Sequence, residues 1–147
     1  MNILYTTNSN FTGKVATGIC SVFENNKDIP EITVYIIGQD LTIKEKEDFM
    51  LIAETYKRNI TIIDLGDITS YFDFEFDTNG WNSIVLARLL LDQLLPSELN
   101  KILYLDGDTI NISSLTELWN LDMGNCVLGA CIEATINQTY RENLGMK

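Results

Sequence analysis

Apolar runs of strand length alternate with stretches of helical periodicity along most of this chain, and that alternation restricts the fold more than any other feature of the sequence. Residues 3–5, 32–37 and 59–64 are short, apolar and rich in β-branched residues, as in buried strands. The stretches between them, about residues 13–25 and 42–57, carry apolar residues at helical spacing. The pattern predicts an α/β fold with a mostly parallel sheet and helices on both faces.

The second half of the chain continues this pattern and brings in a polar segment. Residues 81–95 are apolar on nearly every side, which predicts a buried helix that ends before Pro96. Residues 101–105 then form an apolar strand that leads into Asp106. Ligands of parallel sheets bind beyond the carboxyl ends of the strands. We therefore expect a polar loop at residues 6–12 and the segment after residue 105 to face one crevice.

Composition narrows the classes of partner and of chemistry. With 147 residues the chain is expected to form a single domain, residues 1–147. Its formal net charge of −11 disfavours nucleic acid as a partner. The chain has no histidine, which excludes a complete Ser-His-Asp or Cys-His site. Only three arginines are present, so a diphosphate would bind more readily through a divalent cation.

The sequence also supports an expectation about location. The N-terminus lacks the basic and apolar regions of a signal peptide, and no stretch has the length and apolarity of a membrane span. The three cysteines, Cys20, Cys126 and Cys131, form no Cys-x-x-Cys and indicate reduced thiols, which we expect in the core. We expect a cytoplasmic protein without a transmembrane segment, whose oligomeric state the sequence leaves open.

The strongest candidate for chemistry is Asp106-Gly107-Asp108. In extended backbone, residues two apart point the same way, so both carboxylates can face one cation while Gly107 permits a tight turn. The 11 aspartates would by chance give about one Asp-x-Asp pair, so the spacing alone decides little. The apolar strand before the pair favours a metal site, for Mn²⁺ or alternatively Mg²⁺, over a solvent-facing acidic turn.

Two other interpretations of this segment belong to different classes. A haloacid-dehalogenase-like phosphohydrolase would use Asp106 as nucleophile at the end of an apolar strand. A non-catalytic nucleotide-binding or metal-binding module is the other. A calcium loop of the EF-hand type would match Asp106, Asp108 and Glu117, but would place Ile110 and Asn111 where a ligand and a glycine belong.

Four segments carry a further pattern in a fixed order. They are Ala87-Arg88-Leu89-Leu90-Leu91, Lys101-Ile102-Leu103-Tyr104-Leu105-Asp106-Gly107-Asp108, Ser114-Leu115-Thr116-Glu117-Leu118-Trp119 and Leu128-Gly129-Ala130. Together they resemble glycosyltransferase family 8 over essentially the whole chain. The resemblance implies a GT-A (Rossmann-like) fold and Mn²⁺-dependent, retaining transfer of a hexose, glucose or galactose, from a UDP-sugar to a glycan or to a lipid- or protein-linked acceptor. Family members are longer, so it also implies a truncated, N-terminal portion that binds UDP-hexose with little turnover.

The resemblance assigns roles to individual positions. It places the uridine-binding loop at Thr6, Thr7, Asn8, Asn10 and Phe11 and the wall of the nucleotide pocket at Trp81, Asn82 and Ser83. A helix cap at Asn82 or Ser83 accounts for those two residues equally well. Asn8 stands where the family commonly has Asp, and its amide oxygen can accept the same uracil N–H.

The same resemblance gives two candidate catalytic residues. Arg88 corresponds to an arginine that reaches the sugar donor near its phosphates, and Glu133 falls where the family usually has an Asp that binds hydroxyls of the donor sugar. A buried helix around Arg88 would favour the functional role, because burying an unpaired arginine is costly. Asp106 and Asp108 would hold the metal, and Gly107 would lie against the nucleotide sugar.

Overall fold

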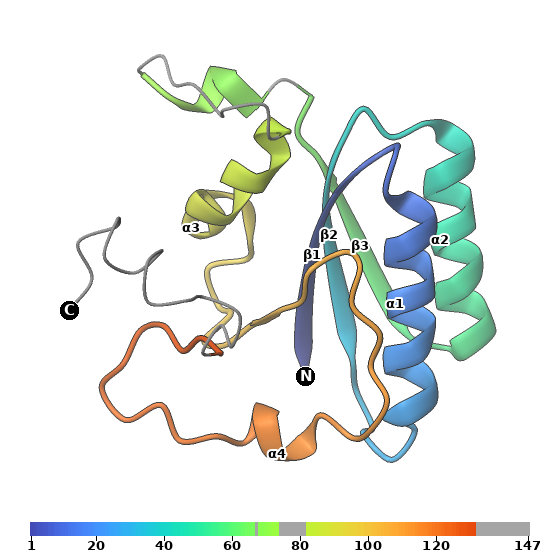
Figure 1. Ribbon diagram of the computed structural model, residues 1–147, viewed down its shortest axis with the longest axis vertical. Helices are drawn as coiled ribbons and strands as arrows, with labels where there is room; N and C mark the ends of the chain where they lie inside the picture. Colours follow the sequence, from blue (N-terminus) through green and yellow to red (C-terminus); the bar gives the residue numbers. More distant parts are fainter. Residues whose placement is uncertain (67, 74–81, 132–147) are drawn as a thin grey trace, which may run out of the picture.

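A four-stranded parallel sheet forms the centre of the protein. The computed structural model describes residues 1–66, 68–73 and 82–131. The strands β1 (Asn2–Asn8), β2 (Thr33–Gln39), β3 (Asn59–Asp64) and β4 (Leu103–Tyr104) lie in the order β3-β2-β1-β4, and each neighbouring pair is parallel (Figure 1). The parallel α/β architecture predicted from the alternation of apolar runs is therefore confirmed.

Two long helices cover one face of this sheet. The helices α1 (Thr12–Asn25) and α2 (Ile43–Tyr56) lie side by side on that face (Figure 1). Alternate residues of the strands point to them, so that Ile3 and Tyr5 pack in one core with Val15 and Ile19 of α1 and Phe49 of α2. This core fixes where the N-terminus of α1 lies relative to the carboxyl end of β1.

Shorter elements cover the opposite face. The 3₁₀ helices η1 (Ile68–Tyr71) and η2 (Ser83–Leu89) and the short helix α3 (Leu91–Leu94) bring Ile68, Ile84 and Leu90 into a second core with Leu4 and Ile37. Helices thus lie on both sides of the sheet, as predicted. The helix α4 (Thr116–Trp119) follows β4 after a loop.

The single buried helix predicted over residues 81–95 is wrong. Within residues 82–95 the chain forms η2 and α3 instead, and Asn82 caps η2 by accepting a hydrogen bond from the Ile84 N–H. Ile84, Ala87 and Leu90 are all buried, at intervals of three residues. A 3₁₀ helix has three residues per turn, so it aligns these positions on the sheet and leaves Arg88 exposed.

Two smaller expectations are corrected as well. The first strand is longer than predicted, because β1 continues to Asn8 and pairs with β2 along its whole length. Thr6, Thr7 and Asn8 therefore belong to a strand and not to a loop. The cysteines are not core residues, since Cys126 and Cys131 are exposed and Cys20 is half-buried.

Within the part of the chain that the structure describes, no helix is long and apolar enough to cross a membrane.

Candidate functional site

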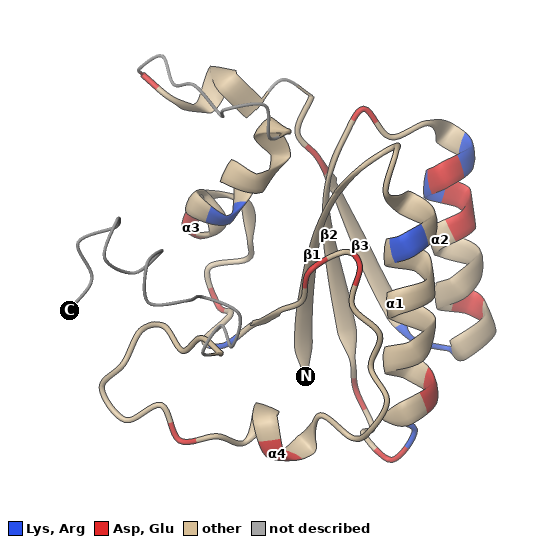
Figure 2. Cartoon of the chain, viewed as in Figure 1, with Lys and Arg blue, Asp and Glu red and all other residues tan. Residues whose placement is uncertain are grey.

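The Asp106-Gly107-Asp108 segment forms a tight turn at the carboxyl end of β4. The Asp106 carbonyl accepts hydrogen bonds from the N–H of Thr109 at 3.1 Å and from its hydroxyl at 2.7 Å. Leu105 N–H bonds to the carbonyl of Leu4 at 3.0 Å, which ties the start of the turn to the central strand. Both aspartates are exposed, and Figure 2 shows these acidic positions on the loop that leaves β4.

Helix α1 packs closely against the turn at two glycines. A Cβ on Gly107 would lie 3.0 Å from Cγ2 of Val15, and a Cβ on Gly18 would lie 2.9 Å from the carbonyl oxygen of Thr109. Gly18 therefore permits close approach of helix and turn, a role that fits its position outside any phosphate-binding glycine motif. Because the turn lies directly on a core helix, its backbone is held in place.

A second anchor lies just after the turn. Asn26 is fully buried at the end of α1, where its amide donates to the Val22 carbonyl and to Asn111 Oδ1, each at 2.8 Å. Its own Oδ1 accepts from the N–H of Leu115 at 2.7 Å. The Asn26 side chain thus forms hydrogen bonds both with α1 and with the segment 111–115, so it fixes that segment against the helix.

Tyr104 connects the turn to the first strand and to η2. Its hydroxyl lies 2.9 Å from Asp106 Oδ1 and 3.2 Å from Thr6 Oγ1, and the Arg88 guanidinium carbon lies 4.9 Å from the ring centroid. Burial is the main cause that raises the pKa of Tyr104 above 10.0, and the hydrogen bond to Asp106 adds to it while the one to Thr6 opposes it. Sequence analysis missed this residue as a site residue.

Arg88 reaches the site from an exposed position. Its Nε donates to the carbonyl of Val85 at 2.8 Å within η2, while the guanidinium lies over Tyr104. The argument that a buried helix would make an unpaired arginine costly is therefore wrong, since Arg88 is exposed. Arg88 is linked to the acidic turn through Tyr104, because the guanidinium lies over the Tyr104 ring and the Tyr104 hydroxyl donates to Asp106.

The carboxyl end of β1 makes a compact polar turn. Asn8 Oδ1 accepts from the N–H of Asn10 at 3.0 Å, and the Asn8 carbonyl accepts from the N–H of Phe11 at 2.9 Å. Phe11 is 42% exposed, and Lys14 Nζ lies 4.3 Å from the centroid of its ring. Thr7, by contrast, is 2% exposed, and its hydroxyl donates to the Asn8 carbonyl. Among the described residues, Asn8 Oδ1 accepts a hydrogen bond only from Asn10, so one of its two lone pairs can take a further donor.

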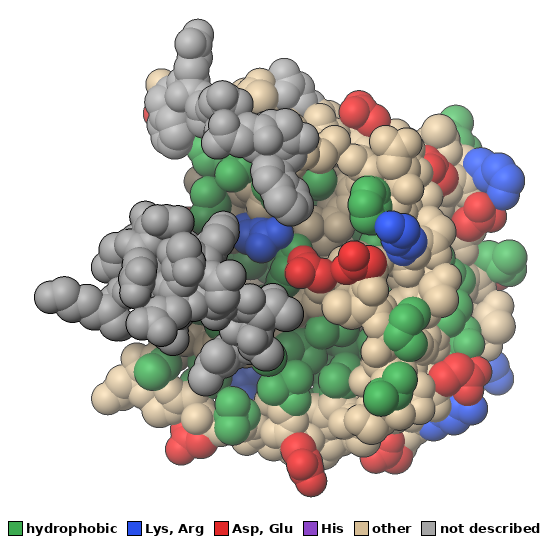
Figure 3. All heavy atoms as spheres, viewed as in Figure 1, with side chains coloured by type: hydrophobic (Ala, Val, Ile, Leu, Met, Phe, Trp, Pro, Cys, Tyr) green, Lys and Arg blue, Asp and Glu red, His purple; other side chains and the backbone are tan. Residues whose placement is uncertain are grey.

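The predicted site residues are thus brought together in part. Thr6, Arg88 and Asp106 surround Tyr104, and a Cβ on Gly107 would lie 3.8 Å from the Thr6 carbonyl oxygen. Trp81 and Glu133 lie outside the described residues. Figure 3 shows neighbouring acidic side chains at the edge of a hollow on this face, with basic side chains on either side.

The acidic turn fits a divalent cation that also binds substrate oxygens. Among residues 1–66, 68–73 and 82–131, no group of three or more acidic, histidine or cysteine side chains could hold a metal by itself. Mg²⁺-like ions are usually held by one or two carboxylates together with phosphate oxygens, and the Asp106–Asp108 pair supplies that number. The residues present therefore suit a metal shared between protein and diphosphate, and not a closed structural site.

A second hollow, of about 610 Å³, lies at the opposite end of the strands. Arg58 is one of the cations that line it, and its guanidinium donates to the backbone carbonyls of Ile29 and Pro30 at 2.6 and 2.9 Å. With its donors used in this way, Arg58 holds the loop before β2 and is not available for a ligand. The other lining residues are Phe23, Glu24, Lys27, Thr55, Tyr56 and Lys57.

The chain is similar to known proteins over nearly its whole length. The model of Glycosyl transferase family 8 matches residues 2–145. A putative glycosyltransferase of Haemophilus influenzae is 26% identical over 150 residues, which cover all of this chain and 44% of that protein. The lipopolysaccharide 1,2-glucosyltransferase of Escherichia coli K12 is 26% identical over 127 residues, covering 86% of this chain and 37% of the relative. The chain thus spans less than half the length of these two relatives.

Solved structures agree on the fold. An active-site mutant of LgtC superposes with a TM-score of 0.84 at 26% identity, covering all of this chain and 52% of the other. The galactosyltransferase LgtC in complex with donor and acceptor sugar analogs gives the same TM-score and coverage at 24% identity. The mostly parallel sheet with flanking helices is therefore the GT-A arrangement, as predicted from the resemblance.

Proposed function

The chain belongs to Glycosyl transferase family 8, and from this premise we propose that it forms the nucleotide-sugar-binding part of an enzyme that transfers a hexose from a UDP-sugar with retention of configuration. The observation that carries the proposal is the turn at Asp106 and Asp108, which lies exposed at the carboxyl end of a parallel sheet where such folds bind ligands. Glucose or galactose is the proposed sugar, since one relative is a glucosyltransferase and one structural neighbour a galactosyltransferase.

Asp106 and Asp108 are the proposed metal ligands. When bound there, Mn²⁺ or Mg²⁺ would neutralise charge on the departing diphosphate. Gly107 is proposed to lie against the nucleotide sugar through its backbone, since a Cβ there would come 3.0 Å from Cγ2 of Val15 and would push the turn away from α1. Arg88, exposed beside Tyr104, would add positive charge at the same place.

The end of β1 is the proposed uridine-binding edge. Asn8 has a lone pair of Oδ1 left to accept a uracil N–H, and the half-exposed Phe11 ring offers a surface on which a base can stack. Thr6 and Asn10 flank these two, and the buried Thr7 would support the strand from within. Trp81 as a pocket wall and Glu133 as a partner of sugar hydroxyls complete the proposed set. The acceptor is proposed to be a glycan or a lipid- or protein-linked group.

Neither alternative function gains support from the geometry. The family match over residues 2–145 gives no reason to prefer a phosphohydrolase with Asp106 as nucleophile. A binding module without chemistry would share the metal site, so it differs from the proposal in turnover and not in binding. Because the chain spans about half of the LgtC chains, we expect the 147 residues to bind UDP but to transfer little sugar. Efficient sugar transfer by this chain would contradict that expectation.

The test is calorimetric titration of UDP with and without Mn²⁺. We expect binding that requires Mn²⁺ and that Asp106→Ala/Asp108→Ala abolishes, because both carboxylate ligands are lost. The matched control is Asp28→Ala/Glu31→Ala, which removes the same charge from exposed residues at the other end of the strands. Absence of binding in the wild type, or equal binding in the Asp106→Ala/Asp108→Ala variant, would refute the site.

A further inference from the structure

Tyr104 occupies a position between three elements that meet at the acidic turn. It is the last residue of β4, and its hydroxyl reaches Thr6 of β1 on one side and Asp106 on the other, at 3.2 and 2.9 Å. The Arg88 guanidinium of η2 lies over its ring. A side chain held from three directions has few other rotamers open to it, so the hydroxyl is fixed next to the carboxylate.

The hydrogen bonds in this group have one consistent direction. An ionised carboxylate only accepts, so the single phenolic proton of Tyr104 is donated to Asp106 Oδ1. The Tyr104 oxygen can then only accept from Thr6, whose hydroxyl is free to rotate toward it. The chain of donation runs from Thr6 to Tyr104 to Asp106. One carboxylate oxygen of Asp106 is thereby engaged, while Oδ2 accepts no hydrogen bond from the described residues.

We propose that Tyr104 is a positioning residue that directs Asp106 to bind an ion through Oδ2 alone and so favours Mn²⁺ or Mg²⁺ over Ca²⁺ at the turn. This inference rests on the metal site proposed above. Small octahedral ions bind a carboxylate through one oxygen, whereas Ca²⁺ takes more ligands and often binds both oxygens of a carboxylate. The hydrogen bond on Oδ1 opposes the two-oxygen mode, because it takes one of the two lone pairs of Oδ1 and draws negative charge away from that oxygen, which leaves Oδ2 as the stronger ligand.

The test is Tyr104→Phe, which keeps the ring and the contact with Arg88 but removes the hydroxyl. Mn²⁺ binding is measured by electron paramagnetic resonance of the free ion, and Ca²⁺ binding by its displacement of Mn²⁺. We expect Mn²⁺ affinity to fall about tenfold, the usual loss when a ligand's orienting hydrogen bond is removed. Ca²⁺ affinity should stay unchanged or rise, because both oxygens of Asp106 become available.

Two further variants control this experiment. Tyr56→Phe removes a phenol–carboxylate hydrogen bond of 3.0 Å, to Glu24 at the opposite end of the strands, and should leave both affinities at the wild-type value. Thr6→Val keeps the Tyr104 hydroxyl but removes the donor that orients it, so the preference for Mn²⁺ should fall by a smaller factor. Thr6→Val also provides the test if Tyr104→Phe does not fold.

The outcomes separate this inference from the proposed function. If the wild type binds Mn²⁺ and Tyr104→Phe weakens Mn²⁺ and Ca²⁺ equally, Tyr104 is only structural and the inference is overturned. Unchanged affinities for both ions overturn it as well. In both cases the metal site stands, provided that Asp106→Ala/Asp108→Ala abolishes Mn²⁺ binding. If the wild type binds no Mn²⁺, the metal site fails and the inference fails with it.

Discussion

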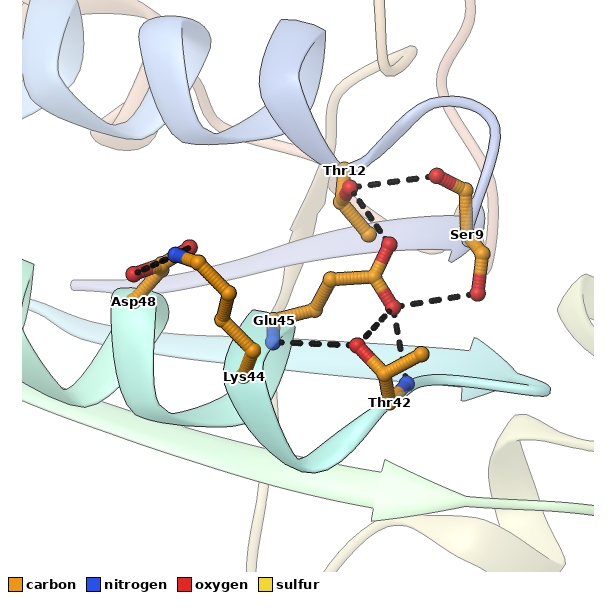
Figure 4. A network of polar contacts seen from close by, with 6 residues as sticks. All are labelled: Ser9, Thr12, Thr42, Lys44, Glu45 and Asp48. Atoms are coloured by element: carbon orange, nitrogen blue, oxygen red, sulfur yellow. Dashed lines mark hydrogen bonds and ion pairs between the residues drawn. The ribbon is translucent and has the colours of Figure 1, made fainter.

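Glu45 and Asp106 both lie near the carboxyl end of the sheet, but their surroundings leave them with different capacities. The Glu45 carboxylate lies within hydrogen-bonding distance of Thr42 N–H at 2.7 Å and of the Thr42, Ser9 and Thr12 hydroxyls at 2.8, 3.0 and 3.0 Å (Figure 4). Asp106 accepts one such bond in the described part of the chain, from Tyr104. Glu45 therefore joins the starts of α1 and α2, whereas Asp106 keeps an oxygen for a ligand.

The comparison shows that an acid's position at this edge does not decide its role. Glu45 is the third residue of α2 and forms a capping box with Thr42, so its carboxylate is engaged in capping the start of that helix. Asp106 follows a strand, and among the described residues only the Tyr104 hydroxyl donates to its carboxylate. The number of nearby donors separates a structural carboxylate from one that can hold a cation.

The largest effect on stability is expected at the anchor under the Asp106 turn. Asn26→Ala should lower the free energy of unfolding by about 2 kcal/mol, because it leaves buried partners such as the Leu115 N–H without a hydrogen bond. Chemical denaturation measures this loss. Mn²⁺ affinity should fall as well, since residues 111–115 are released from α1. Wild-type Mn²⁺ affinity in a destabilised variant would show that the turn does not depend on this anchor.

A smaller effect is expected on the Glu45 side. Thr42→Ala removes the capping side chain of α2 and should cost about 1 kcal/mol in thermal or chemical unfolding. Binding of Mn²⁺ and UDP should not change, because the capping box contributes no ligand. A loss of Mn²⁺ affinity in Thr42→Ala would contradict the separation between the two carboxylates.

The smallest effect concerns pH. The backbone hydrogen bond from Thr42, followed by the Thr42 hydroxyl, holds the pKa of Glu45 below 4.5, and burial opposes this. Since the pKa is lower in the folded state, the stabilisation is present above pH 4.5 and is lost as the pH falls through the folded-state pKa. Thermal unfolding of Glu45→Gln should therefore show a weaker pH dependence below pH 4.5 than the wild type. An unchanged profile would mean that these hydrogen bonds do not favour the ionised form.

Parts of the fold and site followed from residue patterns alone. The β-branched runs predicted the parallel strands, since strands buried on both faces read as continuous apolar runs. The apolar strand before Asp106 placed the acidic turn at the ligand-binding edge. The helix predicted over residues 81–95 failed, because residues that are apolar on nearly every side do not reveal which period the backbone adopts. The three-residue spacing of Ile84, Ala87 and Leu90 was the signal that could have indicated a 3₁₀ helix.

Tyr104 shows what the sequence could indicate and what it could not. Alternation along a strand places residues 104 and 106 on the same side, which was a usable signal for a side chain directed at the acidic turn. Nothing in the sequence, however, pairs Tyr104 with Thr6 or Arg88, which come from β1 and η2. Such contacts depend on strand order and on where η2 lies.

The sequence by itself determined the alternation of strands and helices, the acidic turn after an apolar strand and the absence of histidine, because these depend on local order along the chain. Tertiary structure decided which carboxylate keeps an oxygen for a ligand, since hydrogen-bond donors reach Glu45 from Ser9 in the turn after β1 and from Thr12 at the start of α1, as well as from the N-cap of its own helix. It also decided that Arg88 is exposed and lies over Tyr104. These outcomes depend on distances between segments far apart in sequence, which packing of the two cores against the sheet sets.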